Sequence, residues 1–426
     1  MVLVHSTSAS PRARYTLEHV LRGMLGRDVR WAAGMEEFRS SSLPRVLYGE
    51  ETPTNGILHL RTEPLLETLG PEAEEQFRAV QASLRNGTPA APLSTIFFFL
   101  SLWEEMRATR TDAHGRVLAE ELTVCQPGVD PLLVDRIALH IGAELSSLYP
   151  GLPKAERRYR HVLTVDVDNG LHFRGRPLAR AMGASARDVV RGDLRGLMHR
   201  WGARLGLRPD PYAAWSDRVR EVLPDVDRTI AFVLTRGGGV HDHAADLEHP
   251  QYRALLRSLP SAVEIGLHPS HASGMDAATV QLERARLAEA SGRSVLISRQ
   301  HFLRMRVPAT QRLLLAEGFR EDHTLGIHDR TGFRAATCTP FPWYDLEREQ
   351  ATELMCWPFA VMDSALHERM GLGAEQALAE VDRLHQLVRA VQGTFVSVWH
   401  DRYLSGYRNF GPWPDVLRKA VQLARA

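Results

Sequence analysis

The sequence predicts an α/β protein: a parallel barrel preceded by a smaller α+β domain. From residue 161 onward, short apolar runs rich in β-branched residues alternate with helical stretches. Continuous apolar strands separated by helices are typical of a parallel sheet covered by helices. Six or seven such units favour a barrel over an open sheet. A length of 426 residues leaves room for one further domain.

The expected strands of the barrel are short and apolar. The clearest runs are residues 162–167, 229–235, 263–268, 294–301 and 394–400. Residues 354–362 form a weaker candidate, because Pro358 interrupts the run. A helix is expected over residues 276–290, with Asp276 as its N-cap and Gly292 just past its end. A second helix, 309–317, is ended by Gly318.

The first 150 residues have fewer strand signals. Residues 45–48 and 56–60 are expected as short strands, and apolar spacing predicts helices over 72–84, 94–106 and 131–148. A basic segment, 154–160, then leads into the strand-rich pattern. We therefore expect an N-terminal α+β domain of unassigned role over residues 1–155 and the barrel over residues 156–426.

Composition excludes several classes of protein. The formal net charge is +1, whereas binding to a nucleic-acid backbone requires a basic excess. The three cysteines are too few and too scattered for a disulfide framework or a cysteine-based zinc site. The sequence before Pro11 has no apolar stretch of a secretory signal, and no run approaches the ~20 apolar residues of a membrane span. The expected location is the cytoplasm.

Acidic and imidazole side chains stand at the ends of the expected strands. In a barrel of parallel strands the C-terminal ends share one mouth, where active sites lie. These groups should therefore meet in space although more than 200 residues separate them in sequence. They are Asp166, Asp168, His268, His271, His301 and His400.

One carboxylate with two imidazoles is a ligand set suited to Zn²⁺ or another borderline divalent ion. Asp166 and Asp168 lie on the same side of an extended chain, so one of them can serve as a base while the other binds the ion. A histidine across the mouth would then protonate a leaving group. This set is typical of metal-assisted hydrolysis.

Five segments in order carry a resemblance to a known family. TVDVDN, EIGLHPSH, SRQH, GFREDHT and SVWHD, spread over residues 160–405, resemble the motifs of the polysaccharide deacetylases (the NodB-homology group, carbohydrate esterase family four). The closest similarity is to a divergent bacterial branch with an extra N-terminal domain. The resemblance implies a distorted (β/α)₇ barrel and a metal-dependent removal of acetyl groups from a sugar polymer.

The resemblance also implies roles for the acidic and imidazole residues. Asp166 matches the catalytic base, and Asp168 and His268 match metal ligands. The family's second histidine usually follows the first by four residues, where this chain has Ala272. His271 and His301 are the two alternatives, and His301 is favoured because Pro269 and the following turn direct His271 away.

Further roles follow from the same motifs. Arg299 paired with Asp322 would orient the base, and His400 would be the general acid. Trp399 would help to wall the pocket, with Arg334 and Trp343 as further candidates for substrate contact. For Arg334 and Trp343 a purely structural role is the alternative.

The glycine-rich loop that contains His241, Asp242 and His243 has the HxH spacing of some metal sites. A mobile, solvated loop is the commoner interpretation of such a sequence.

The function predicted from the sequence is metal-dependent removal of an acetyl group, mainly N-acetyl, from an amino sugar in a glycan or glycan precursor. Zn²⁺ is the expected ion, and an acetylated glycan or sugar is the expected partner. Two alternatives stay open: a non-catalytic glycan-binding or assembly protein that keeps the fold, and a metal amidohydrolase of a small N-acyl substrate. The sequence does not specify the oligomeric state.

Overall fold

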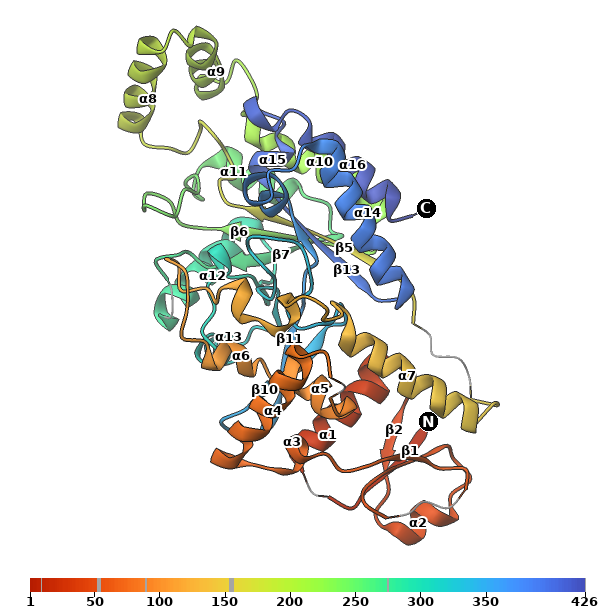
Figure 1. Ribbon diagram of the computed structural model, residues 1–426. Coiled ribbons are helices and arrows are strands. Elements are labelled where there is room, and N and C mark those ends of the chain that lie inside the picture. Colours follow the sequence, from red (N-terminus) through yellow and green to blue (C-terminus); the bar gives the residue numbers. More distant parts are fainter. Residues whose placement is uncertain (9, 52–54, 89, 153–156, 274–275, 426) are drawn as a thin grey trace.

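A computed structural model describes residues 1–8, 10–51, 55–88, 90–152, 157–273 and 276–425. Two sheets organise the chain, one of four strands and one of nine (Figure 1). The boundary expected at residues 155 and 156 lies outside the described residues. No helix in the described ranges is both long enough and apolar enough to cross a membrane.

The smaller sheet is parallel and belongs to the first 60 residues. Its strand order is β2-β1-β3-β4. The expected strands at 45–48 and 56–60 are confirmed, whereas the sequence analysis missed the first two strands. The bounds are β1 Val2–Ser6, β2 Val29–Trp31, β3 Arg45–Tyr48 and β4 Leu58–Leu60.

Helices complete the N-terminal part. The helix expected over 94–106 is instead two helices, because Leu102 adopts the left-handed conformation (φ 55°), which ends one helix and begins the next. The helices are α1 Pro11–Glu18, α2 Met35–Ser40, α3 Pro64–Glu67, α4 Ala73–Arg85, α5 Pro92–Leu100, α6 Trp103–Arg107 and α7 Leu133–Leu148.

The larger sheet is almost entirely parallel. Its order is β10-β11-β9-β8-β7-β6-β5-β13-β12, and only the pair β10–β11 is antiparallel. The large parallel sheet confirms the α/β class. The strands are β5 Arg160–Val167, β6 Arg228–Leu234, β7 Val263–His268, β8 Ile297–Ser298, β9 Glu321–Asp322, β10 Phe341–Asp345, β11 Gln350–Cys356, β12 Val361–Met362 and β13 Thr394–His400.

The segment that Pro358 interrupts connects two distant strands of this sheet. Its first half, β11, pairs with β9, and its second half, β12, pairs with β13. Between them, the amide of Phe359 donates to the carbonyl of Leu325 and the amide of Ala360 to that of Val396. One stretch of chain therefore runs from the β9 side of the sheet to the β13 side.

Helices flank the larger sheet, and α8 and α9 project away from it (Figure 1). The N-cap expected at Asp276 is confirmed: its side chain accepts from the amide of Thr279, and Gly292 ends the helix at φ 70°. The helices are α8 Leu178–Val190, α9 Leu194–Arg204, α10 Trp215–Val222, α11 Pro250–Ser258, α12 Ala277–Ser291, α13 Ala309–Ala316, α14 Ala374–Ala390, α15 Asp401–Leu404 and α16 Trp413–Leu423.

The N-terminal part packs firmly against the larger sheet. One hydrophobic cluster extends from Val2 to Val421 and includes residues of both parts. Asp135 of α7 is fully buried and accepts hydrogen bonds from Arg157 (2.9 Å), from the amide of Cys338 (3.0 Å) and from the hydroxyl of Thr339 (2.6 Å). This shared core fixes the position of the N-terminal loops relative to the strand ends.

Candidate active site

Neighbouring strands of the larger sheet deliver their polar end residues to one cavity of about 110 Å³. Asp166 lies near the end of β5 and Asp168 just beyond it, His268 ends β7, His301 follows β8, and His400 ends β13. Because these strands are parallel, their C-terminal ends lie on one side of the sheet. The structure thus brings together five of the six residues that the strand ends indicated, and His271 is the exception.

Asp168 is the centre of a candidate metal site. Its Oδ1 atom lies 3.4 Å from Nε2 of His268 and 3.6 Å from Nε2 of His301. This oxygen is buried and has no hydrogen-bond partner among the described residues. An unpartnered buried carboxylate oxygen facing two imidazole nitrogens fits a divalent cation.

Both histidines are held by their other ring nitrogen. Nδ1 of His268 donates to the carbonyl oxygen of Arg299 (2.7 Å), and Nδ1 of His301 to Oδ1 of Asp242 (3.0 Å). Such bonds fix the tautomer and leave Nε2 free to bind a metal. The structure therefore places His301, and not His271, beside Asp168 and His268.

The charges around Asp168 keep it ionised. Burial alone would raise the pKa of Asp168, but His268, His400 and His301 outweigh burial and hold that pKa well below its usual range. Burial lowers the pKa of His301. Burial would lower the pKa of His268, but Asp166 and Asp168 raise it, so a metal ion that binds there would displace a proton from that ring.

Asp166 is paired with a fully buried arginine. Its Oδ1 atom lies 2.6 Å from Nη1 of Arg299, which also donates to the hydroxyl of Thr164 (2.9 Å). The expected direct pair between Arg299 and Asp322 is not formed. The Asp322 carboxylate instead accepts hydrogen bonds from Thr324 and Gln311 and acts on Arg299 through its charge.

His400 has a carboxylate partner that the sequence analysis missed. Its Nδ1 lies 2.5 Å from Oδ1 of Asp363, while its Nε2 lies 3.9 Å from Oδ2 of Asp168. Burial would lower the pKa of His400, but Asp363 outweighs it, and the pKa rises to about 9. Asp363 directly follows β12, so it too stands at a strand end, which the interruption at Pro358 obscured.

Asp242 is the second functional residue that the sequence analysis did not assign. It lies in the loop after β6, and besides His301 it accepts the backbone amides of His271 (2.7 Å) and Ala272 (3.2 Å). The histidines on either side of it drew attention to the loop, but the sequence gave no reason to favour the aspartate.

The three residues expected to contact substrate lie elsewhere. Trp399 is 2 % exposed, because successive residues of β13 face opposite sides and His400 takes the side of the cavity. Trp343 is fully buried on β10. Arg334 is buried and donates to Glu105 (3.0 Å) and to the carbonyl of Gly326 (3.0 Å). None of them lines the cavity at Asp168, so the expectation is not supported for this cavity.

The rim of the cavity carries three arginines, one of them from the N-terminal part, and Glu368, which pairs with Arg402 (3.0 Å). Arg116, Arg369 and Arg402 line it together with Phe302 and His328. Arg116 donates to the backbone carbonyl of Phe302 (3.2 Å) and therefore reaches across from the N-terminal part to the site.

The first 150 residues match a family of unknown function. The match is to DUF7033 over residues 2–150, and no curated protein matches the chain. Eight solved chains are similar to this chain, among them the three that follow. A protein described as a polysaccharide deacetylase of Mycobacterium smegmatis is 16% identical (TM-score 0.40), with 62% of this chain and 84% of that chain covered.

The other two are also described as polysaccharide deacetylases. The Bacillus cereus structure is 11% identical (TM-score 0.32; 63% of this chain and 88% of that chain), and the Pseudomonas aeruginosa PAO1 structure is 13% identical (TM-score 0.38; 65% and 87%).

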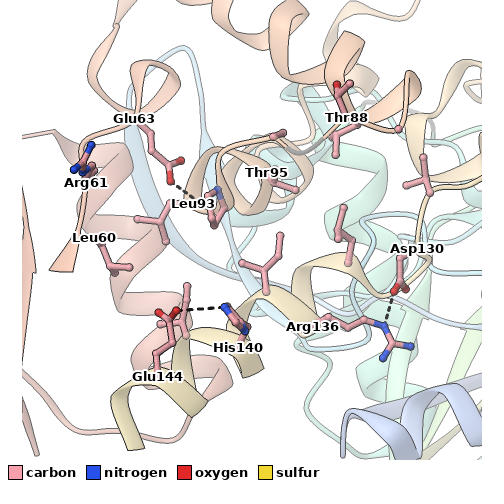
Figure 2. Close-up of a pocket in the computed structure, with 18 of the residues that line it drawn as sticks. Leu60, Arg61, Glu63, Thr88, Leu93, Thr95, Asp130, Arg136, His140 and Glu144 are labelled. Atoms are coloured by element: carbon pink, nitrogen blue, oxygen red, sulfur yellow. Dashed lines mark hydrogen bonds and ion pairs between the residues drawn. The ribbon is translucent and has the colours of Figure 1, made fainter. Parts of the chain in front are cut away.

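A larger cavity of about 720 Å³ lies in the N-terminal part (Figure 2). Apolar side chains such as Leu84 and Ile137 line most of it, and two pairs of its polar side chains contact each other: Arg136 pairs with Asp130 (2.5 Å) and His140 with Glu144 (3.3 Å). This cavity is the larger of the two, but side chains that are already paired with each other do not supply a catalytic base or a metal ligand. The candidate base and metal ligands line the smaller polar cavity instead.

Proposed function

We propose that the chain is a metal-dependent hydrolase that removes a short acyl group, foremost acetyl, from an amino sugar in a glycan or glycan precursor. The observation that carries the proposal is the grouping of Asp168, His268 and His301 in one cavity. Beside them lie a carboxylate held by an arginine, Asp166 with Arg299, and an imidazole held by a carboxylate, His400 with Asp363. The motif resemblance supports the choice of an acetylated sugar as substrate.

We also propose that the larger sheet closes into the expected seven-stranded barrel. The segment 350–362 would then fill the place between β9 and β13, with β11 beside β9 and β12 beside β13. Adjacent strands are about 4.8 Å apart, so β8 and β5 would lie about 14 Å apart in a flat sheet. The contact between Arg299, just after β8, and Asp166 on β5 supports a strongly curved sheet.

Asp168, His268 and His301 would hold a divalent ion, with Zn²⁺ as the expected metal. Such an ion supplies Lewis acidity toward the acyl carbonyl and toward the attacking water. Asp166 accepts the proton of that water at a carboxylate oxygen. Arg299 orients Asp166 through the 2.6 Å contact between Nη1 and Oδ1.

His400 acts at the other end of the reaction. Asp363 holds the ring through Nδ1 and stabilises its protonated form, so Nε2 carries a proton into the cavity. That proton passes to the departing nitrogen as the amide bond breaks. The small cavity supports a short acyl group, since 110 Å³ is well below the ~300 Å³ of a site that encloses a drug-sized ligand. The remainder of the substrate would lie across the rim of the cavity.

Two substitutions test the assignment. His268→Ala should abolish turnover and the metal equivalent held with Asp168 and His301, whereas Asp166→Asn should keep that metal and lower kcat by about 10²- to 10⁴-fold. Metal is measured by elemental analysis and turnover by acetate release from neutral and acidic N-acetylated oligosaccharides. A fully active His268→Ala protein that has lost this equivalent would refute the proposal.

The same assay separates the two alternatives. A wild-type protein that binds no stoichiometric metal and releases no acetate would favour the non-catalytic glycan-binding protein. Release from small N-acyl amides but from no oligosaccharide would favour the amidohydrolase of a small substrate.

A further inference from the structure

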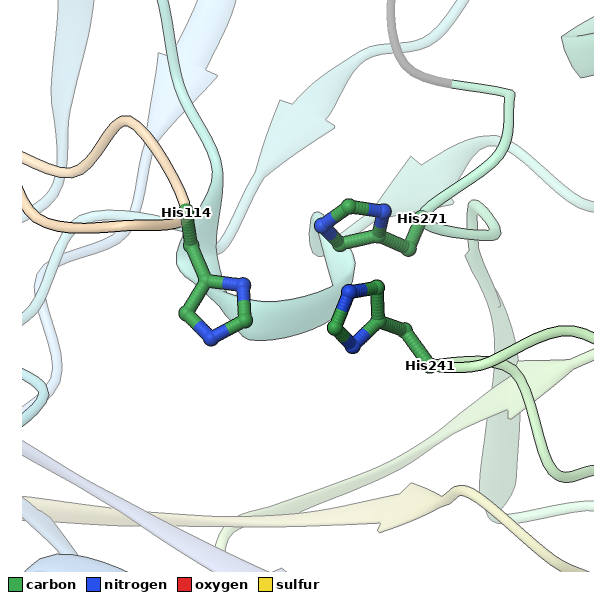
Figure 3. Close-up of side chains that lie close together, drawn as sticks. All are labelled: His114, His241 and His271. Carbon is green, nitrogen blue, oxygen red and sulfur yellow. The ribbon is translucent and has the colours of Figure 1, made fainter.

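A second group of histidines lies outside the candidate active site. His114 belongs to the loop after α6, His241 to the glycine-rich loop after β6, and His271 to the turn after β7 (Figure 3). One ring nitrogen from each lies within 4.8 Å of the others. Figure 3 shows the three rings facing a shared space, each with a nitrogen directed into it.

Two of these nitrogens are unsatisfied. Nδ1 of His114 and Nε2 of His271 are buried and have no hydrogen-bond partner among the described residues. A buried polar atom without a partner is destabilising, so each such atom calls for a bound group. Three imidazole nitrogens around one space are a recognised ligand set for Zn²⁺ and similar ions, with a fourth position left for water.

The backbone around these rings is fixed by other contacts. Arg304 donates to the carbonyl of His271 (2.7 Å) and to that of His114 (3.1 Å), which joins the two segments. Asp242, next to His241, accepts the amide of His271 (2.7 Å). The three rings are thus placed by a scaffold that does not depend on contacts between the rings.

Phe302 forms an apolar wall beside the group. Its ring stacks on His114 (centroids 4.5 Å apart, 23° between planes) and meets the other two rings edge-on. Its backbone is left-handed, with φ 60°, which is uncommon for a bulky residue. Residues held in such conformations cluster at ligand sites, where the surrounding contacts stabilise them.

We propose that His114, His241 and His271 bind a second metal ion of the zinc class, and that this ion joins the N-terminal part to the rim of the candidate active site. His114 is the N-terminal ligand, and the other two come from loops of the larger sheet. Arg116 follows His114 by two residues and lines the active-site cavity. An ion on His114 therefore holds Arg116 at that cavity.

The second site uses none of the ligands of the first, so it can be tested apart from the proposed function. The full chain, without an affinity tag and freed of metal by a chelator, is titrated with Zn²⁺ in a calorimeter. We expect two equivalents to bind the wild type. The double variant His268→Ala/His301→Ala should retain one equivalent.

Adding His114→Ala to this double variant should weaken the remaining Zn²⁺ binding by more than about 100-fold, because the loss of a direct ligand exceeds the effect of an outer-shell change. His241→Ala is a second variant, on a surface loop. His140→Ala, whose side chain on α7 is 76% exposed, is the matched control and should leave binding unchanged. Circular dichroism verifies the fold of each variant.

Two results would overturn the second site. The first is a folded His268→Ala/His301→Ala protein that binds no Zn²⁺. The second is a Zn²⁺ affinity of that protein that stays unchanged when His114→Ala or His241→Ala is added. If His268→Ala/His301→Ala loses an equivalent and His114→Ala and His241→Ala lose none, the metal of the proposed active site is supported and the second site is refuted. Loss in the His114→Ala and His241→Ala variants alone would support the second site and remove the metal from the first.

Discussion

Asp363 gives the most informative single test of the proposed mechanism. Asp363→Asn keeps the shape of the side chain but removes the charge that faces Nδ1 of His400 at 2.5 Å. The rise of the His400 pKa from 6.5 to about 9 corresponds to about 3 kcal/mol of stabilisation of the protonated ring, supplied mainly by Asp363 and also by Asp168. Loss of that stabilisation should lower kcat for an N-acetyl substrate by about 100-fold.

The leaving group provides the decisive comparison. An amine leaves only after it is protonated, whereas an activated phenolate leaves without a proton. Asp363→Asn should therefore reduce hydrolysis of an acetylated amino sugar strongly and that of a p-nitrophenyl acetate ester only slightly. Both rates are measured at saturating substrate, together with metal content, which should stay at the wild-type level.

A matched control guards against general damage. Asp345 is a carboxylate of similar burial (1% exposed) that pairs with Arg312 outside the cavity, so Asp345→Asn changes charge in the interior without touching the proposed acid. Equal loss of amide and ester hydrolysis in Asp363→Asn, or an unchanged amide rate, would refute the role of the Asp363–His400 pair.

Three further outcomes follow from buried charges. Arg299→Met should keep the metal but lower kcat at least tenfold and reduce stability by about 3–5 kcal/mol, measured by turnover and urea unfolding, because Asp166 loses its buried partner. Asp135→Ala should cost a similar 3–5 kcal/mol in urea unfolding, since Arg157 is left unpaired between the two parts of the chain; a loss below 1 kcal/mol would contradict this. Burial would raise the pKa of Glu321, but hydrogen bonds from His323 and Arg228 lower it from 4.5 to about 2, so its contribution is present above pH 4.5 and disappears as the pH falls toward 2. Glu321→Gln should flatten the pH dependence of stability in that window.

Strand ends explain how much of the site the sequence predicted. Asp166, Asp168, His268 and His400 each end or follow an apolar run, and parallel pairing brings such ends to one side of a sheet. Asp363 escaped notice because its strand, β12, has only two residues. Short strands depend on their neighbours for hydrogen bonds, so they leave little signal in the local sequence.

The sequence by itself determined the alternation of apolar strands and helices, and with it the parallel sheet and the grouping of acidic and imidazole residues at one edge. Only the tertiary structure decided between the two candidate histidines. His301 and His271 both follow strands closely, but Asp242, from a third loop, binds the ring of one and only the backbone of the other. The tertiary structure likewise decided which face of β13 Trp399 occupies. Which of two nearby side chains faces a cavity depends on hydrogen bonds between segments far apart in sequence, and local patterns do not encode them.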